Sequence, residues 1–253
     1  MSLSDPGLIS VSGGLAWHAK AVFRHRGLWA NFLGRIEGFL LDWELALHEN
    51  NPETIKGLLL IGPSGGWCLP KSGFLDRFPS VVAVDPDPLA EKIFLKRHPR
   101  AADQEQVWVP STFERVLPAL LNRHPGHAIL FCNVLGQLRY QPNKTIERIE
   151  FELNQVKQAL QGRHWASFHD RISGPTASTI AGELEFFEPG RVLTQDLGRR
   201  VANGGEWLDH LTEQVLPDTV GRRLIAWPIS KIRTHWVEAG WVSPDNAIDA
   251  VRQ

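Results

Sequence analysis

Three glycines and one aspartate are the residues of this sequence whose types and spacing best suit a chemical role. Gly62, Gly65 and Gly66 follow the short apolar run 57–61, and Asp85 ends the next apolar run. Glycines let a backbone turn tightly and approach a ligand without an intervening Cβ. A carboxylate at the tip of the following strand can accept hydrogen bonds from both hydroxyls of a ribose, and the spacing is close to the ~20 residues of nucleotide-binding units. The sequence therefore predicts a βαβ unit with a nucleoside site outside the carboxyl ends of its strands.

The spacing of the glycines separates this loop from two common nucleotide-binding patterns. The loop reads Gly-x-x-Gly-Gly, whereas a dinucleotide fingerprint reads Gly-x-Gly-x-x-Gly, and the Gly-Lys-Ser or Gly-Lys-Thr of a P-loop is absent. The segments LLLIGPSGGWCLP and VVAVDPDPLA together resemble the first two motifs of class I S-adenosylmethionine-dependent methyltransferases. Ile61 stands where that family usually has an acid, and Pro63 is less usual in the loop. The resemblance covers about residues 56–242 and implies S-adenosylmethionine as the cofactor.

The resemblance also implies which residues bind the cofactor. The glycine loop would lie against the donor and Asp85 on its ribose, while Asn133, at the end of the fourth expected strand, would lie beside the methyl group. The end of the third expected strand has no acid before Glu114, which leaves Ser111 as the candidate there. Asn133 is not followed by the Pro-Pro-aromatic signature of base or glutamine N-methylation. The expected cofactor-binding residues are Gly62, Pro63, Ser64, Gly65, Gly66, Asp85, Pro86, Ser111, Asn133 and Val134.

His169 and Asp170 directly follow the fifth expected strand, 165–168, and are the candidate catalytic residues. A histidine with a pKa near neutrality can remove a proton from a hydroxyl or amine acceptor, with an adjacent acid orienting it. Methyl transfer to an acceptor that is already nucleophilic depends on alignment more than on a base, so a purely structural pair stays open. The ten histidines of the chain show no zinc-binding spacing, so no metal site is expected.

The order of apolar segments predicts an α/β fold. Strands and helices alternate five times, which indicates a doubly wound, mostly parallel sheet with helices on both faces. Two strand-like segments near the end, 223–229 and 235–242, predict a terminal antiparallel hairpin and bring the expected sheet to seven strands. The methyltransferase fold has such a hairpin, and plain dinucleotide-binding folds usually lack it. Residues 173–219 interrupt the alternation as an expected insertion, with a helix predicted over 206–216.

The N-terminal 55 residues precede the expected methyltransferase domain, 56–253, and form an expected arm and helical cap. Between residues 16 and 49 apolar residues recur at spacings of four and three, as on one face of a helix. Gly34 and Gly38 weaken this helix, which must be held by packing or broken in two. A cap buried against the sheet and a lid over the substrate are both compatible with the pattern.

Composition narrows the class of protein. The chain has 253 residues, of which 43% are hydrophobic, enough for a sizeable core. Its net charge of −1 gives no global attraction to nucleic acid or a membrane surface. Its two cysteines, Cys68 and Cys132, exclude a disulfide framework and are expected as reduced thiols at the mouths of neighbouring strands. The sequence shows no signal segment and no membrane-spanning run, so a cytoplasmic protein is expected.

These observations favour an enzyme that transfers a methyl group from S-adenosylmethionine to a nucleophilic acceptor, with a small molecule as the favoured acceptor. They leave nucleic-acid and protein acceptors open. A non-catalytic domain that binds S-adenosylmethionine or another nucleoside, and an enzyme that uses the same donor for another transfer, are also compatible with the pattern. An NAD-dependent oxidoreductase is less favoured, because both the glycine spacing and the terminal hairpin oppose it.

Overall fold

The structure is a computed structural model that describes residues 15–50, 55–71, 73–87, 89–99, 104–141, 144–175, 185–201 and 206–244. Within the first helix, side chains are described from residue 27 to residue 49. The expected N-terminal arm lies outside the described residues.

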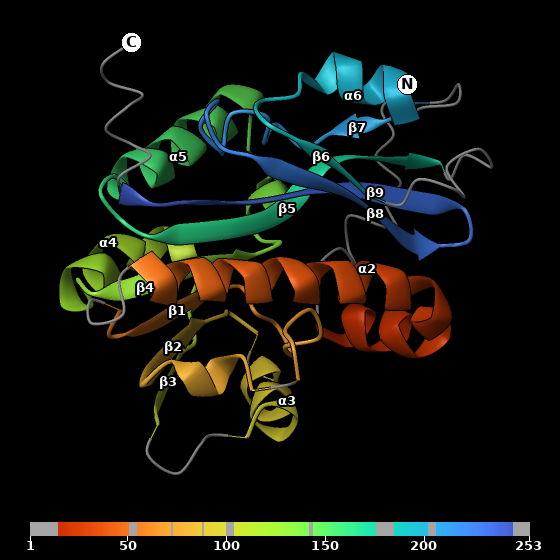
Figure 1. The fold of residues 1–253 in the computed structure, drawn as a ribbon. Coiled ribbons are helices and arrows are strands. Elements are labelled where there is room, and N and C mark those ends of the chain that lie inside the picture. Colours follow the sequence, from red (N-terminus) through yellow and green to blue (C-terminus); the bar gives the residue numbers. More distant parts are fainter. Residues whose placement is uncertain are drawn as a thin grey trace.

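Among the described residues, a mixed sheet of nine strands forms the centre of the structure (Figure 1). Its strands follow the order β3-β2-β1-β4-β5-β9-β8-β6, and β7 pairs with β5 beside this path. β1 to β5 are mutually parallel, β9 runs antiparallel to β5, and β8 runs antiparallel to β9. The strands are β1 (Gly57–Ile61), β2 (Ser80–Val84), β3 (Glu105–Val109), β4 (His127–Cys132), β5 (Trp165–Pro175), β6 (Glu185–Glu188), β7 (Leu208–Asp209), β8 (Arg222–Ser230) and β9 (Arg233–Val242).

The number of strands corrects the expectation of seven. The five parallel strands and the terminal hairpin are present as expected, and the two further strands, β6 and β7, come from the segment expected to be an insertion. The cause is the length of β5, which continues to Pro175 instead of ending at Phe168. Together with the long hairpin, this extension offers backbone groups with which β6 and β7 pair. The doubly wound α/β class with a terminal antiparallel hairpin is otherwise confirmed.

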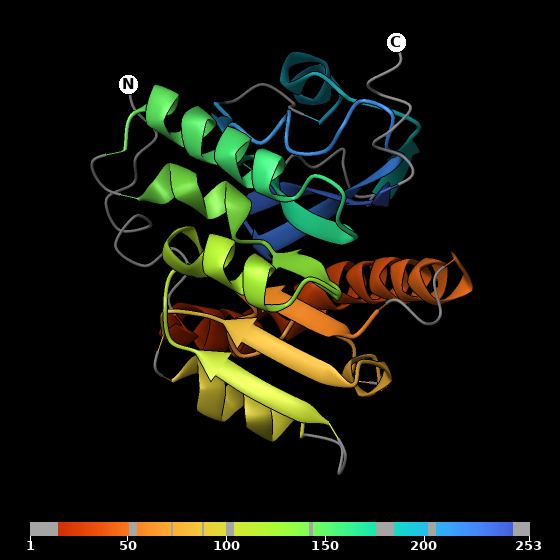
Figure 2. The same ribbon diagram turned by 90° about the vertical axis from the view of Figure 1, so that its left-hand side faces the viewer.

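Helices cover both faces of the sheet, because side chains alternate between its faces along each buried strand. α2 and α3 pack on one face, and α4 and α5 pack on the other (Figure 2). A third apolar cluster lies between α6 and residues of β5, β8 and β9, among them Ile172, Leu224 and Trp236. The helices are α2 (Leu15–Asn50), α3 (Ala90–Arg97), α4 (Phe113–Arg123), α5 (Ile146–Ala159), α6 (Thr194–Val201) and the 3-10 helices η1 (Leu75–Arg77) and η2 (Leu135–Tyr140).

Helix α2 is a single helix of 36 residues that packs along β8 and β9. Trp29, Ile36 and Trp43 are fully buried at its sheet-facing side, as the periodicity predicts. Gly34 and Gly38 do not break it, since packing of the apolar face stabilises the helix against their unfavourable propensity.

Two local expectations are wrong. The described residues between β1 and β2 form turns and the short η1 rather than an α-helix, because Pro70 and two glycines with positive φ, Gly66 and Gly73, favour turns. The helix predicted over 206–216 is also absent from the described part of that range, where β7 and turns occur instead.

Glu238 of β9 is the centre of a fully buried ionic network. Its carboxylate accepts hydrogen bonds from Arg171 at 2.6 Å and Arg222 at 3.2 Å, and lies 3.2 Å from the ring of His169. Burial alone would raise the pKa of Glu238, but the charges of Arg171, His169 and Arg222 outweigh it and hold that pKa below its usual value of 4.5. The carboxylate therefore stays ionised and compensates two arginines that have no contact with solvent.

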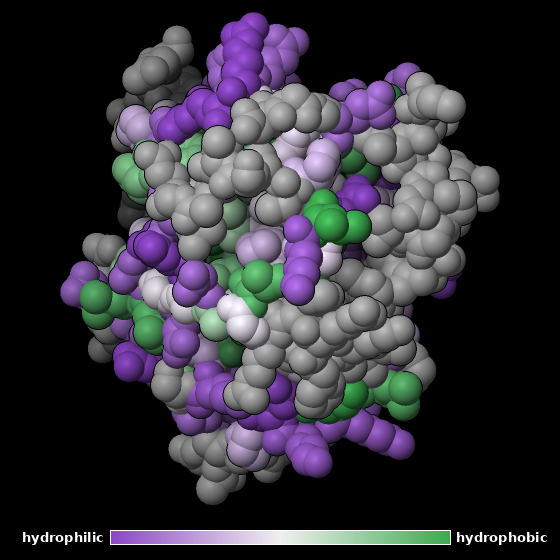
Figure 3. Space-filling view, turned by 90° about the vertical axis from the view of Figure 1, so that its right-hand side faces the viewer, coloured by the Kyte–Doolittle hydropathy of each residue, from purple (hydrophilic) through white to green (hydrophobic). Residues whose placement is uncertain are grey.

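Within the described residues, no helix combines the length and the apolarity needed to cross a bilayer. On the face drawn in Figure 3, the hydrophobic residues visible among the described ones appear as separate spots between hydrophilic ones.

We expect Glu238→Ala to lower the free energy of unfolding by about 3–5 kcal/mol, because it leaves buried arginines without a counter-charge. Denaturant unfolding at neutral pH measures this change. Asp196→Ala, which removes an ion pair with Arg199 at the exposed surface, is the control and should leave the midpoint almost unchanged. A loss equal to that of the control would contradict a stabilising role for the network.

The same network gives a pH dependence whose sign follows from the lowered pKa of Glu238. A carboxyl whose pKa falls on folding contributes its full stability above the unfolded-state value of 4.5, and loses it as the pH falls through the lower folded-state value. The difference in unfolding free energy between the wild type and Glu238→Gln should therefore be constant from pH 7 to about pH 5 and shrink below that. A difference that grows on acidification would contradict it.

Candidate functional site

A cavity of about 430 Å³ opens at the carboxyl ends of β1, β2 and β4. This is where ligands of open α/β sheets bind, and the volume is in the usual range for small-molecule sites. The residues that line it are Trp29, Gly62, Pro63, Ser64, Trp67, Cys68, Val84, Asp85, Pro86, Asp87, Thr112, Phe113, Glu114, Cys132, Asn133, Val134, Gln137, Gln141, Phe168 and Trp227.

The loop after β1 takes a tight conformation that requires glycine at its first position. Gly62 has a φ of +68°, and a Cβ added there would lie 2.8 Å from the Cβ of Val134 on the neighbouring strand connection. Ser64 is also in the left-handed region, with a φ of +51°. The loop thus brings its backbone against the start of η2, at the floor of the cavity.

Asp85 fixes this loop from the end of β2. Its Oδ2 accepts a hydrogen bond from the backbone N–H of Ser64 at 2.9 Å, and its Oδ1 accepts one from the N–H of Asp87 at 2.9 Å. Burial raises the pKa of Asp85 above its usual 3.8, and these two hydrogen bonds oppose that shift. Each carboxylate oxygen has two lone pairs, so acceptor capacity remains for hydroxyl groups of a ligand in the cavity.

Seven of the ten expected cofactor-binding residues line the cavity, and three do not. The seven are Gly62, Pro63, Ser64, Asp85, Pro86, Asn133 and Val134. Gly65 instead packs against Trp67, and Gly66 packs against His98, whose ring nitrogen lies 2.9 Å from its carbonyl oxygen. Ser111 is also outside the lining. Gly65 and Gly66 allow the loop to pack closely against α3. The spacing of glycines in the sequence does not distinguish such packing from contact with a ligand.

The end of β3 contributes a different set of residues from the one expected. Thr112, Phe113 and Glu114 line the cavity at the start of α4. Thr112 is the N-cap of α4 and makes no side-chain capping bond. Glu114 Oε1 instead accepts a hydrogen bond from Gln141 at 3.0 Å, which joins the two connections that flank this end of the cavity.

The opposite end of the cavity, which we call the transfer end, is aromatic and contains both cysteines. It is formed by Trp29 of α2, Trp227 of β8 and Phe168 of β5, with Cys68 and Cys132 beside them. The rings of Trp29 and Trp227 meet edge to face, with centroids 4.9 Å apart. Sequence reasoning missed the three aromatic residues, because each also fits an apolar helix or strand pattern. Helix α2 therefore both covers the sheet and supplies a wall of the cavity.

The structure separates the two candidate catalytic residues. Both lie within the extended β5 rather than in a loop after it, so their side chains point to opposite faces of the sheet. His169 is fully buried, with Nδ1 2.9 Å from Ser167 Oγ and Nε2 3.2 Å from Glu238 Oε2, and it does not line the cavity.

Asp170 lies just behind the cavity wall and is tied to Asn133. Its backbone N–H donates to Asn133 Oδ1 at 3.0 Å, and its Oδ2 accepts from Asn133 Nδ2 at 3.4 Å. Burial alone would raise the pKa of Asp170, but the imidazoles of His235 and His210 and the Asn133 amide outweigh it and lower that pKa to about 2. Asn133 holds a φ of +53° to make both contacts, an uncommon conformation that asparagine tolerates better than most residues.

Comparison with known proteins finds similar structures at low sequence identity. No protein-family model matches the chain, and no curated protein sequence matches it. N-methyltransferase NodS from Bradyrhizobium japonicum is 10% identical, with a TM-score of 0.42 over 85% of this chain and 97% of that chain. A SAM-dependent methyltransferase from Anabaena variabilis is 13% identical, with a TM-score of 0.39 over 86% and 93% of the two chains. CalS10, an amino pentose methyltransferase from Micromonospora echinaspora, is 14% identical, with a TM-score of 0.34 over 87% and 84%.

We expect both cysteines to react slowly with thiol reagents in the folded protein. Cys68 is partly accessible, yet burial raises its pKa to about 12, and burial raises the pKa of Cys132 well above 9. Because the thiolate is the reactive form, alkylation of Cys68 at pH 8 should be about 10³-fold slower than that of a free cysteine.

Mass-spectrometric labelling of the native and the guanidinium-unfolded protein tests this expectation. Both thiols should label rapidly only after unfolding. Rapid labelling of Cys68 in the native protein would show that the transfer end is more polar than its described lining.

Proposed function

We propose that the protein is an S-adenosylmethionine-dependent methyltransferase that acts on a small-molecule acceptor. The observation that carries this proposal is one cavity in which the Gly62 loop, the Asp85 carboxylate and Asn133 come together at the carboxyl ends of β1, β2 and β4. The sheet that presents them has an antiparallel β9 between β5 and β8, unlike the continuous parallel order of dinucleotide-binding folds. The strand order supports the proposal only by analogy with other folds, whereas the residues of the site support it chemically.

The residues present fit a nucleoside with a cationic sulfonium. Asp85 has remaining acceptor capacity for ribose hydroxyls, and the glycine loop lets the backbone approach the donor without a Cβ. The aromatic faces of the transfer end can stabilise a positive charge in a site that excludes water. When bound, S-adenosylmethionine supplies an electrophilic methyl group.

The proposed roles of the residues are binding, alignment and exclusion of water. Trp29 and Trp227 would hold the acceptor against the transfer end, and Asn133 would orient the reacting groups. Among the described residues that line the cavity there is no histidine and no lysine. The rate would therefore depend mainly on proximity and in-line alignment, which can supply several orders of magnitude. The volume of about 430 Å³ and the aromatic wall favour a small molecule as acceptor.

We expect the purified protein to bind S-adenosylmethionine and S-adenosylhomocysteine with micromolar affinity, and Asp85→Asn to weaken both by about 10- to 100-fold. A hydrogen bond to a charged group contributes about 1.5–3 kcal/mol, and each 1.4 kcal/mol is a tenfold change in affinity. Because the pKa of Asp85 is raised, binding should also weaken as the pH falls towards that raised value, where the carboxyl is protonated. Calorimetric titration measures both effects.

Asp76→Asn is the matched control, since Asp76 is an exposed acid in the same connection between β1 and β2 and does not line the cavity. Its affinity should equal that of the wild type. Binding of neither ligand would contradict the proposed function, and binding of NAD alone would favour an oxidoreductase. Binding without methyl transfer across a panel of hydroxyl and amine acceptors would favour a non-catalytic nucleoside-binding domain.

A further inference from the structure

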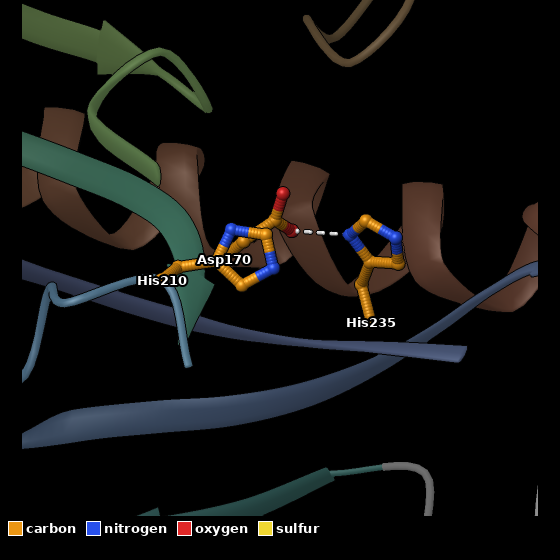
Figure 4. A group of neighbouring side chains, drawn as sticks. All are labelled: Asp170, His210 and His235. Atoms are coloured by element: carbon orange, nitrogen blue, oxygen red, sulfur yellow. Dashed lines mark ion pairs between the residues drawn. The ribbon is translucent and has the colours of Figure 1, made fainter. Parts of the chain in front are cut away.

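A cluster of two imidazoles and one carboxylate lies behind the transfer end of the cavity (Figure 4). Asp170 comes from β5, His235 from β9 and His210 from the turn that follows β7. All three side chains are buried, and one potential ligand atom from each lies within 4.8 Å of the other two. The cluster adjoins the cavity through Asn133, which contacts Asp170, and through Trp227, whose ring centroid is 5.9 Å from that of His235.

Asp170 and His235 form a buried ion pair, with Oδ1 of Asp170 3.0 Å from Nδ1 of His235 (Figure 4). Neither of these two atoms has a further hydrogen-bond partner among the described residues. The pair therefore presents a carboxylate oxygen and an imidazole nitrogen side by side, and both are ligand types that zinc takes. Two ligand atoms held ~2.0–2.2 Å from one metal ion also lie about 3 Å apart, so this separation suits a shared ion.

His210 is oriented as a metal ligand would be. Its Nδ1 lies 3.1 Å from the backbone carbonyl oxygen of Gly136, so Nδ1 carries the proton and Nε2 keeps its lone pair. Metal-binding histidines almost always donate their second ring nitrogen in this way to a carbonyl or a carboxylate. Nε2 is 3.0 Å from the hydroxyl of Ser173, which can rotate to release it.

We propose that Asp170, His210 and His235 bind a divalent first-row transition metal ion, with zinc as the prototype. Two imidazoles and one carboxylate are the nitrogen and oxygen ligands that such ions prefer, whereas Mg²⁺ and Ca²⁺ prefer oxygen ligands alone. The hydrogen bond from Asn133 Nδ2 to the other oxygen of Asp170 would hold the carboxylate in position, as outer contacts do in metal sites. Three protein ligands leave a position for a further ligand, the number found in catalytic zinc sites.

The spacing of the three residues explains why no metal motif is visible in the sequence. They are far apart along the chain and meet only because β9 pairs with β5 and the turn after β7 lies against β5. Tyr140 and Arg233 also face the cluster, the former with its ring 5.3 Å from that of His210. The competing interpretation is an Asp–His pair that binds no ion. A measurement of metal binding distinguishes it from the proposed metal site.

Metal binding by the full-length protein tests the proposal independently of the methyl donor. The protein is stripped with a chelator and titrated with Zn²⁺ by calorimetry and with Co²⁺ by visible absorption, and Mg²⁺ is titrated in parallel. We expect one Zn²⁺ or Co²⁺ per chain and no competition by excess Mg²⁺. Loss of an outer contact costs about 10- to 100-fold in metal affinity, so loss of a ligand in Asp170→Asn, His210→Gln or His235→Gln should cost at least that much.

Two further variants distinguish a specific loss of metal binding from a failure of the variant to fold. His48→Gln, far from the cluster and half-buried on α2, is the matched control and should keep wild-type affinity. His235→Cys, which replaces one metal ligand by another, should retain Zn²⁺ and give the Co²⁺ complex a new sulfur-to-metal absorption band. Absence of Zn²⁺ and Co²⁺ binding in the wild type, binding unaffected by the ligand substitutions, or binding of Mg²⁺ in preference to both would overturn the proposal.

Discussion

The pairing of β5 with β9 is the constraint on which the rest of this structure depends. β5 is parallel to β4 on one side and antiparallel to β9 on the other, with a register that runs from Trp165↔Val242 to Pro175↔Arg233 and an irregularity between Asp170 and Ile172. This arrangement joins the parallel half of the sheet to the hairpin. It also buries ionisable residues on both faces, which only mutual compensation makes tolerable.

The two faces of β5 carry two separate clusters of ionisable groups. On one face, His169 and Arg171 meet Glu238 in a network with no solvent contact, and this network is structural. On the other face, Asp170 lies next to the cavity and meets His235. Adjacent residues of one strand therefore belong to different clusters, because successive side chains point in opposite directions.

Much of the fold could be predicted from the sequence, because its strongest signals are local. The buried runs of β1, β2 and β4, the periodicity of α2 and the terminal hairpin are each legible within a short window. The length of β5 was not, since His169, Asp170 and Arg171 are polar and look like the end of a strand. The burial of His169 and Arg171 depends on Glu238, which is 69 and 67 residues away along the chain, so no local pattern reveals it.

The sequence likewise predicts some residues of the candidate site and not others. The spacing of strand ends predicts Gly62 and Asp85, the family resemblance implies Asn133, and all three line the cavity. Trp29, Phe168 and Trp227 were not assigned to the site, since an aromatic residue in an apolar pattern looks the same whether it packs in the core or faces a ligand. The sequence does not predict His210 and His235 as metal ligands, because strand pairing, and not their spacing along the chain, brings them together.

Asn133 lies between the cavity and the cluster of Asp170, His210 and His235. Asn133 lines the cavity, while its side-chain amide forms hydrogen bonds with both the main chain and the carboxylate of Asp170. If both sites bind as we propose, a residue shared in this way would couple them thermodynamically. A cavity ligand that shifts Asn133 would then change the affinity of the Asp170 cluster for a metal ion by some factor, and reciprocity requires the metal ion to change the affinity of the cavity for its ligand by the same factor. The cavity and the cluster would then act as one cooperative unit, with a single asparagine as the link.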